Sequence, residues 1–140
     1  MTKKALKRVI IILFFFTGIG AMAGGFGFIV DPSGKTLGMS TEILPSEVFF
    51  DFLIPGLFLF IVIGIGHILV TILFLISRSL GVWKYLFLMG FILGIWIIIQ
   101  ILMIGYLSVL QPIYLLVALV EMFLASKWHK AADNVMYVLK

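Results

Sequence analysis

The sequence predicts an all-α integral membrane protein with four transmembrane helices in an up-down bundle. Two observations lead to this fold class. Of the 140 residues, 64% are hydrophobic and only 11% are charged, which is too little charge to cover a surface that faces water. The apolar residues also gather in four runs, each close to the roughly 20 residues that cross the hydrocarbon core of a bilayer. At this length we expect one integral membrane domain over residues 1–140.

The first transmembrane helix is expected over about residues 7–30, after a basic N-terminal segment. Its apolar run is longer than the roughly 7–15 residues of a secretory signal core, so we expect it to remain as a span. Gly20 and Gly24 form a GxxxG pair, and small residues at this spacing let two helix backbones approach closely. We expect this pair to pack against a neighbouring helix of the same chain, and a seam between two copies of the chain is the alternative.

An extracytoplasmic loop is expected over residues 31–48. It opens with Asp31, Pro32, Ser33 and Gly34, which is a typical turn sequence. A connection of nearly 20 residues is long for a compact protein, and it suggests either a role of its own or a short helix on the membrane surface.

The second transmembrane helix is expected over about residues 49–77. Pro55 falls in its first turns, where proline predicts a kink or a late helix start. The third helix is expected over about residues 83–105, and Gly90 and Gly94 give it a second GxxxG pair for helix packing.

The fourth transmembrane helix is expected over about residues 110–128. The cytoplasmic tail over residues 129–140 has apolar residues at helical spacing. This pattern predicts a short amphipathic C-terminal helix at the lipid surface, or a continuation of the fourth helix.

The distribution of basic residues predicts the orientation in the membrane. With a cytoplasmic N-terminus, Lys35 is the only basic residue on the outer side. The inner segments then hold the other nine: Lys3, Lys4, Lys7, Arg8, Arg78, Lys84, Lys127, Lys130 and Lys140. This bias predicts a multi-pass protein of the cell (inner) membrane with both termini in the cytoplasm.

Strongly polar side chains within the predicted spans are the candidate functional residues: His67, Gln100 and Glu121. Ionisable groups at membrane depth cost free energy unless they are paired or hydrated. His67 and Glu121 are expected at comparable depth, so they could pair across two helices. Thr71, one helical turn from His67, and Tyr114, on roughly the face of Glu121, complete the set.

These polar groups allow three interpretations. They could be interhelical hydrogen bonds that hold the bundle in one register, a proton or ion relay through His67 and Glu121, or a pocket for a ligand or lipid. A metal site is not expected, because one histidine and one glutamate are too few ligands. No cofactor is expected either, and the absence of cysteine removes disulfides and thiolate chemistry.

Several short segments carry a resemblance to a known group of proteins. They are Gly24-Gly25, Asp31-Pro32-Ser33-Gly34, Leu37-Gly38-Met39, Phe52-Leu53-Ile54-Pro55-Gly56-Leu57, Trp96-Ile97-Ile98-Ile99-Gln100 and Gln111-Pro112-Ile113-Tyr114. Together they resemble a family of small bacterial four-helix integral membrane proteins that is labelled uncharacterised. The architecture alone is also loosely similar to the DoxX-like four-helix membrane proteins. The resemblance implies four spans in a bacterial inner membrane and no particular activity.

The function expected first is that of a non-catalytic membrane subunit or accessory protein. Its partners would be the bilayer and a second membrane protein or another copy of the chain, docked along the glycine pairs. A small transporter or ion pathway that uses His67 and Glu121 is the alternative, and a lipid- or quinone-linked enzyme is the third. Nucleic-acid binding is not expected, because the basic residues flank apolar spans and form no separate polar domain.

Overall fold

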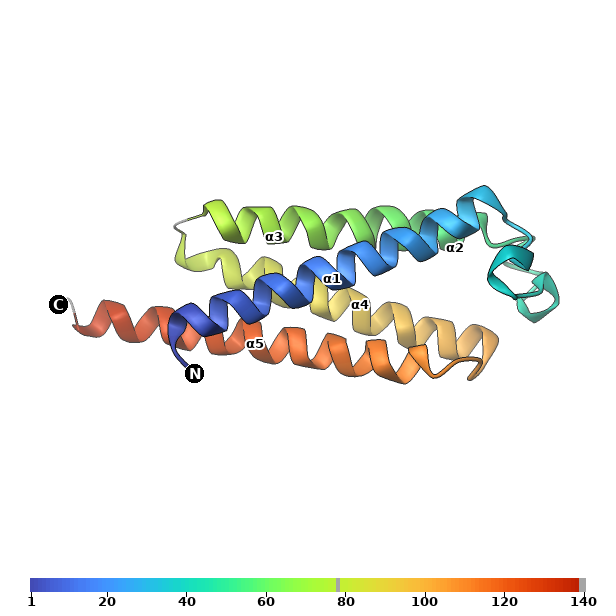
Figure 1. Cartoon of the computed structure of the whole chain (residues 1–140). Helices are drawn as coiled ribbons and strands as arrows, with labels where there is room; N and C mark the ends of the chain where they lie inside the picture. The colour runs from blue at the N-terminus through green and yellow to red at the C-terminus, as the bar shows by residue number, and fades with distance from the viewer. Residues whose placement is uncertain (78, 139–140) are drawn as a thin grey trace.

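Four helical segments that are long and apolar enough to cross a bilayer dominate the computed structural model (Figure 1). They cover Lys3–Val30, Leu53–Ile76, Leu80–Ile104 and Leu110–Ala132. The structure describes residues 1–77 and 79–138, with side chains as far as residue 132. This part of the chain contains no β-strand, so the predicted all-α class is confirmed.

The helix α1 (Lys3–Val30) starts a full turn earlier than the predicted residue 7. Thr2 is the reason, because its hydroxyl accepts a hydrogen bond from the Ala5 N–H over 3.2 Å. A threonine in this capping position satisfies one of the N–H groups that the first turn leaves without a partner.

The second segment consists of three helical pieces rather than one. They are α2 (Leu53–Leu57), the π-helical segment η3 (Phe58–Ile65) and α3 (Gly66–Ile76). The segment begins at Leu53 and not near residue 49, because the Asp51 carboxylate accepts the Leu53 N–H over 2.9 Å and starts the helix there. Pro55 lies in the first turn, where backbone N–H groups have no partner within the helix. The absent N–H of proline therefore costs no hydrogen bond there. A late start was one of the two effects expected near this proline, and the hydrogen bond to Asp51 accounts for its position.

The last two segments pair along the bundle. The helix α4 (Trp83–Ile104), which follows the 3₁₀ turn η4 (Leu80–Val82), agrees with the predicted range 83–105. The helix α5 (Leu110–Val138) starts at the predicted residue but does not stop near residue 128. As far as Val138 the tail is therefore the continuation of this helix and not a separate short one. Residues 139–140 and the side chains of residues 133–138 lie outside the described part.

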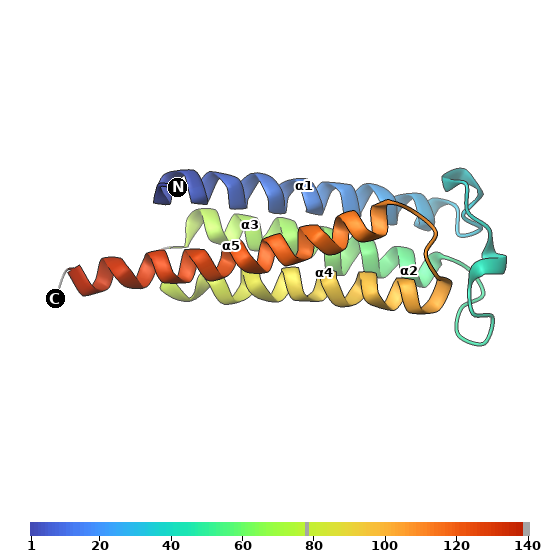
Figure 2. The same ribbon diagram turned by 90° about the horizontal axis from the view of Figure 1, so that it is seen from below.

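Two helix pairs make up the bundle (Figures 1 and 2). In the first pair, α1 packs along α2, η3 and α3; in the second, α4 packs along most of α5. Contacts between α1 and α5 join the two pairs. Phe14, Phe74 and Leu86 are among the side chains that fill the core nearer the chain termini, and Ala21 and Ile63 belong to a second core cluster further along.

Gly25 sets the close approach of α1 to the second segment. A Cβ atom on Gly25 would lie 2.6 Å from the backbone nitrogen of Phe60 and 2.7 Å from the carbonyl oxygen of Gly56. Gly24 faces only the Leu59 side chain, at 3.4 Å from where its Cβ would be. The closest backbone contact thus falls on Gly25 and not on the Gly20–Gly24 pair that the GxxxG spacing indicated, and it lies within one chain.

The loop between α1 and α2 covers residues 31–52 and contains two 3₁₀ turns, η1 (Lys35–Leu37) and η2 (Thr41–Ile43). The loop is therefore longer than the predicted range 31–48. Its only helical pieces are these two short turns, so the short surface helix that was considered for it does not form. The Phe52 N–H donates to the Pro32 carbonyl over 2.9 Å, which joins the two ends of the loop.

Asp31 organises the start of this loop. Its carboxylate accepts four hydrogen bonds, from the N–H and hydroxyl groups of Ser33 and Thr36. The hydroxyl donors of Ser33 and then of Thr36 hold the pKa of Asp31 well below its usual value, because they stabilise the charged form.

The two neighbouring glycines of α1 offer a matched test of this packing. We expect Gly25→Ala to destabilise the protein by about 1–3 kcal/mol, because the new methyl group meets backbone atoms that cannot move aside. Gly24→Ala should be neutral or slightly stabilising, since alanine favours helix over glycine by about 1 kcal/mol. Unfolding in detergent followed by circular dichroism measures both. Equal effects of the two substitutions would contradict the proposed helix contact.

Candidate functional site

The centre of the bundle holds a hydrogen-bonded pair of ionisable side chains. His67 of α3 places its Nε2 atom 3.0 Å from Oε2 of Glu121 on α5. Both side chains are fully buried. The structure therefore brings together the two residues that the sequence analysis expected at comparable depth.

The geometry fixes how many protons this pair carries. Nδ1 of His67 lies 2.7 Å from the carbonyl oxygen of Ile63, and a carbonyl can only accept, so Nδ1 carries a proton and donates it. Nε2 then either accepts a proton from a neutral Glu121 carboxyl or donates one to its carboxylate. In both states one proton lies between Nε2 and Oε2, and the pair has no net charge. Adding or removing a proton would leave a net charge in the apolar core, which is costly.

Thr17 of α1 is a third member of the network, and the sequence analysis did not include it. Its hydroxyl lies 2.9 Å from Oε1 of Glu121 and 2.9 Å from the carbonyl oxygen of Leu13. Thr17 is buried, with 3% of its surface exposed. Its contact with Glu121 extends the network from α3 and α5 to α1. The available signal was that Thr17 is the only hydroxyl residue in the apolar run of the first helix.

The surrounding backbone positions the pair. Ile63, whose carbonyl holds Nδ1, lies in the π-helical segment η3, where the wider turn changes the usual α-helical hydrogen-bond register. On the other side, Gly90 of α4 makes room for Glu121: a Cβ atom at Gly90 would lie 3.0 Å from the Cβ of Glu121 and 3.1 Å from the Ala118 carbonyl oxygen. Gly94 of the same predicted pair is less crowded, with the Ala118 Cβ at 3.5 Å.

The other predicted site residues do not join the network. The Thr71 hydroxyl is buried and donates to the His67 carbonyl over 2.7 Å, so it supports the backbone and not the imidazole. Gln100 and Tyr114 lie instead on the wall of a cavity. Gly20 lies opposite Tyr114, whose hydroxyl oxygen would be 2.8 Å from a Cβ on this glycine.

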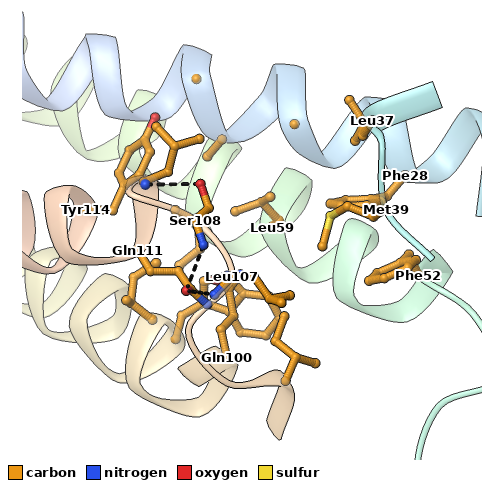
Figure 3. A pocket seen from close by; sticks show the side chains of 18 of the residues that line it. Phe28, Leu37, Met39, Phe52, Leu59, Gln100, Leu107, Ser108, Gln111 and Tyr114 are labelled. Atoms are coloured by element: carbon orange, nitrogen blue, oxygen red, sulfur yellow. Dashed lines mark hydrogen bonds between the residues drawn. The ribbon is translucent and has the colours of Figure 1, made fainter. Parts of the chain in front are cut away.

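The cavity has a volume of about 740 Å³ and lies between α1 and η3 on one side and α4 and α5 on the other. Figure 3 shows Phe28, Met39 and Phe52 gathered at its loop end, with Gln100 and Tyr114 on the α4–α5 side. Its size falls in the range of small-molecule binding sites.

The lining of this cavity is apolar with a few uncharged polar groups. Among the described residues that line it, none is Asp, Glu, Lys, Arg or His. Gln111 is already used within the chain, since its Oε1 accepts the N–H groups of Leu107 and Ser108 and its Nε2 donates to the Gly105 carbonyl. The indole Nε1 of Trp96, in contrast, is buried and has no hydrogen-bond partner among the described residues.

Thr17 connects the cavity with the buried pair. It belongs to the lining and also contacts Glu121. Neither His67 nor Glu121 lines the cavity itself. Within the described residues, no three His, Asp or Glu side chains lie close enough together to hold a metal ion.

Comparison with protein-family models, curated proteins and solved structures found no match to this chain. The resemblance to small bacterial four-helix membrane proteins, and the looser one to DoxX-like proteins, therefore stays a prediction. The chemistry of the site follows from its geometry alone.

Two substitutions of Glu121 test whether its hydrogen bonds hold the bundle together. In Glu121→Gln the side-chain amide can donate to Nε2 of His67 and its oxygen can accept from Thr17, so we expect a loss of stability below about 1 kcal/mol. Glu121→Ala leaves Nε2 of His67 without a partner and opens a cavity, although Thr17 keeps the Leu13 carbonyl as an acceptor, so it should cost about 2–4 kcal/mol. Unfolding in detergent measures the difference, and a glutamine variant as unstable as the alanine variant would refute the pairing.

Proposed function

We propose that this chain is a multi-pass protein of a cell (inner) membrane, with its helices crossing up and down and both termini in the cytoplasm. Large apolar side chains on the outer surface support insertion, for example Phe16 and Leu102, which are 78% and 79% exposed. Such side chains suit contact with lipid better than contact with water. The excess of Lys and Arg in the two terminal segments and in the connection over residues 78–84, compared with Lys35 alone in the loop over residues 31–52, supports this orientation.

Within this membrane, the proposed role is that of a non-catalytic accessory protein that binds an uncharged, lipid-soluble ligand. The observation that carries the proposal is the cavity of about 740 Å³ with an uncharged lining. A cavity of this kind suits a mainly hydrocarbon molecule that has few polar groups, because a charged ligand would find no counter-charge there.

The non-catalytic part of the proposal rests on how the ionisable groups are used. His67 and Glu121 are fully buried and contact each other. Neither lines the cavity, so neither touches a molecule bound there. General acid–base catalysis needs such a group within hydrogen-bond reach of the substrate.

A cavity-filling substitution tests the binding role. The wild-type protein, purified from its native membrane, should carry an uncharged lipid-soluble molecule that native mass spectrometry detects. Gly24→Leu should remove it, because Gly24 lines the cavity and the larger side chain occupies that space. Ala23→Leu is the matched control, since Ala23 is exposed and outside the lining. An empty wild-type protein, or equal occupancy in all three proteins, would contradict the proposal.

A proton pathway through His67 and Glu121 is the second candidate. It is favoured by the contact of Thr17 with both the cavity and Glu121, because the second oxygen of the Glu121 carboxyl, Oε1, thereby has a hydroxyl neighbour at the cavity wall. In proteoliposomes with an imposed pH gradient, this function predicts faster proton flux for the wild type than for Glu121→Gln, which cannot release a proton. Equal flux would exclude it.

A further inference from the structure

Two lysine side chains of α1 lie over aromatic rings at the end of the bundle opposite the loop (Figure 1). The ammonium nitrogen of Lys3 is 5.3 Å from the ring centre of Trp128 on α5. That of Lys7 is 5.5 Å from the ring centre of Phe74 on α3. The two rings contact each other edge to face, with centroids 4.8 Å apart. Cation–π contacts with one aromatic pair therefore hold two positive charges next to each other.

The described part of the chain does not neutralise these charges. Its one salt bridge is that between His67 and Glu121, so neither lysine is paired with a described carboxylate. Four of the six acidic residues lie in the loop over residues 31–52, at the other end of the bundle (Figure 1). The sixth, Asp133, has a side chain outside the described part. A counter-charge for the lysines is therefore expected from another molecule.

The first turns of α1 concentrate positive charge where a helix disfavours it. Lys3 and Lys7 stand one turn apart, and like charges at this spacing repel each other. Lys4 and Arg8 form a second pair of this kind. All four lie near the positive end of the helix dipole, and the first turn contains no acidic residue. A bound anion would offset both costs.

We infer that Lys3, Lys7, Phe74 and Trp128 form a site for the phosphate group of an anionic phospholipid. Ammonium groups offer the phosphate oxygens both positive charge and hydrogen-bond donors. Clusters of basic residues next to a membrane span attract anionic lipids in the same way. A zwitterionic lipid suits the site less well, because its own cationic group adds positive charge to it.

The surroundings favour a lipid over a soluble phosphate. Val9 follows Lys7 by two residues on α1 and is 42% exposed. Ile76 follows Phe74 by two residues on α3 and is 74% exposed. Such apolar surface beside the lysines suits the acyl chains of a lipid whose phosphate they hold. None of the four site residues lines the cavity, so lipid binding here is independent of the ligand proposed for the cavity.

Native mass spectrometry of the purified full chain in detergent tests the site without any variant. The wild type should bind dioleoylphosphatidylglycerol about tenfold or more tightly than dioleoylphosphatidylcholine, since only the former has a net negative charge. Millimolar inorganic phosphate should not displace it. Equal affinity for the two lipids overturns the inference. Displacement by inorganic phosphate overturns it too, since the site would then belong to a soluble anion.

Two double variants separate this site from a general attraction to basic residues. Lys3→Gln/Lys7→Gln removes both charges of the site and keeps polar side chains. It should weaken phosphatidylglycerol binding about 10- to 30-fold and leave phosphatidylcholine binding within about twofold.

Lys4→Gln/Arg8→Gln is the matched control, because it removes the same charge at the same spacing from the same helix. Lys4 and Arg8 are exposed, and neither lies over an aromatic ring of the described chain. This variant should bind phosphatidylglycerol within about twofold of the wild type. Equal weakening by both variants shows diffuse attraction and overturns the site, as does the absence of weakening in both.

Discussion

The hydrogen bond between His67 and Glu121 is the interaction on which the rest of the structure depends. It joins α3 to α5 at 3.0 Å in a fully buried position, and Thr17 extends it to α1. Helices in lipid gain little from the hydrophobic effect, so directed polar contacts and close packing decide how they associate. Because Nδ1 of His67 is committed to a carbonyl, the network is complete only when the pair shares one proton.

Close backbone packing on either side makes this contact possible. Gly25 lets α1 approach the second segment, and Gly90 lets α5 approach α4 beside Glu121. Between these two contacts the helices leave the cavity next to Thr17. The same arrangement therefore produces a tightly packed polar core and, beside it, an uncharged space that can hold a ligand.

The sequence predicted the helices better than their details. Long apolar runs fix where a span must lie. The starts of α4 and α5 and the comparable depth of His67 and Glu121 could therefore be read from the sequence, whereas the starts of α1 and of the second segment differ from the prediction by four residues each. The π-helical segment Phe58–Ile65 has no local signal, since it depends on packing against α1. Thr17 was missed because a hydroxyl in a span is common, and its role appears only when three helices meet. The Gly20–Gly24 pair likewise marked α1 as a helix with a small-residue surface, but these two glycines line the cavity and the close backbone contact falls on Gly25.

In this structure His67 carries a fixed proton on Nδ1 and shares a second one with Glu121. Nitrogen-15 NMR of labelled protein tests this most directly, with His129→Gln to remove the signal of the only other histidine. We expect a protonated Nδ1 and an Nε2 signal that changes in Glu121→Gln. A protonated Nε2 beside a bare Nδ1, or a His67 spectrum that is the same with and without the Glu121 carboxyl, would contradict it.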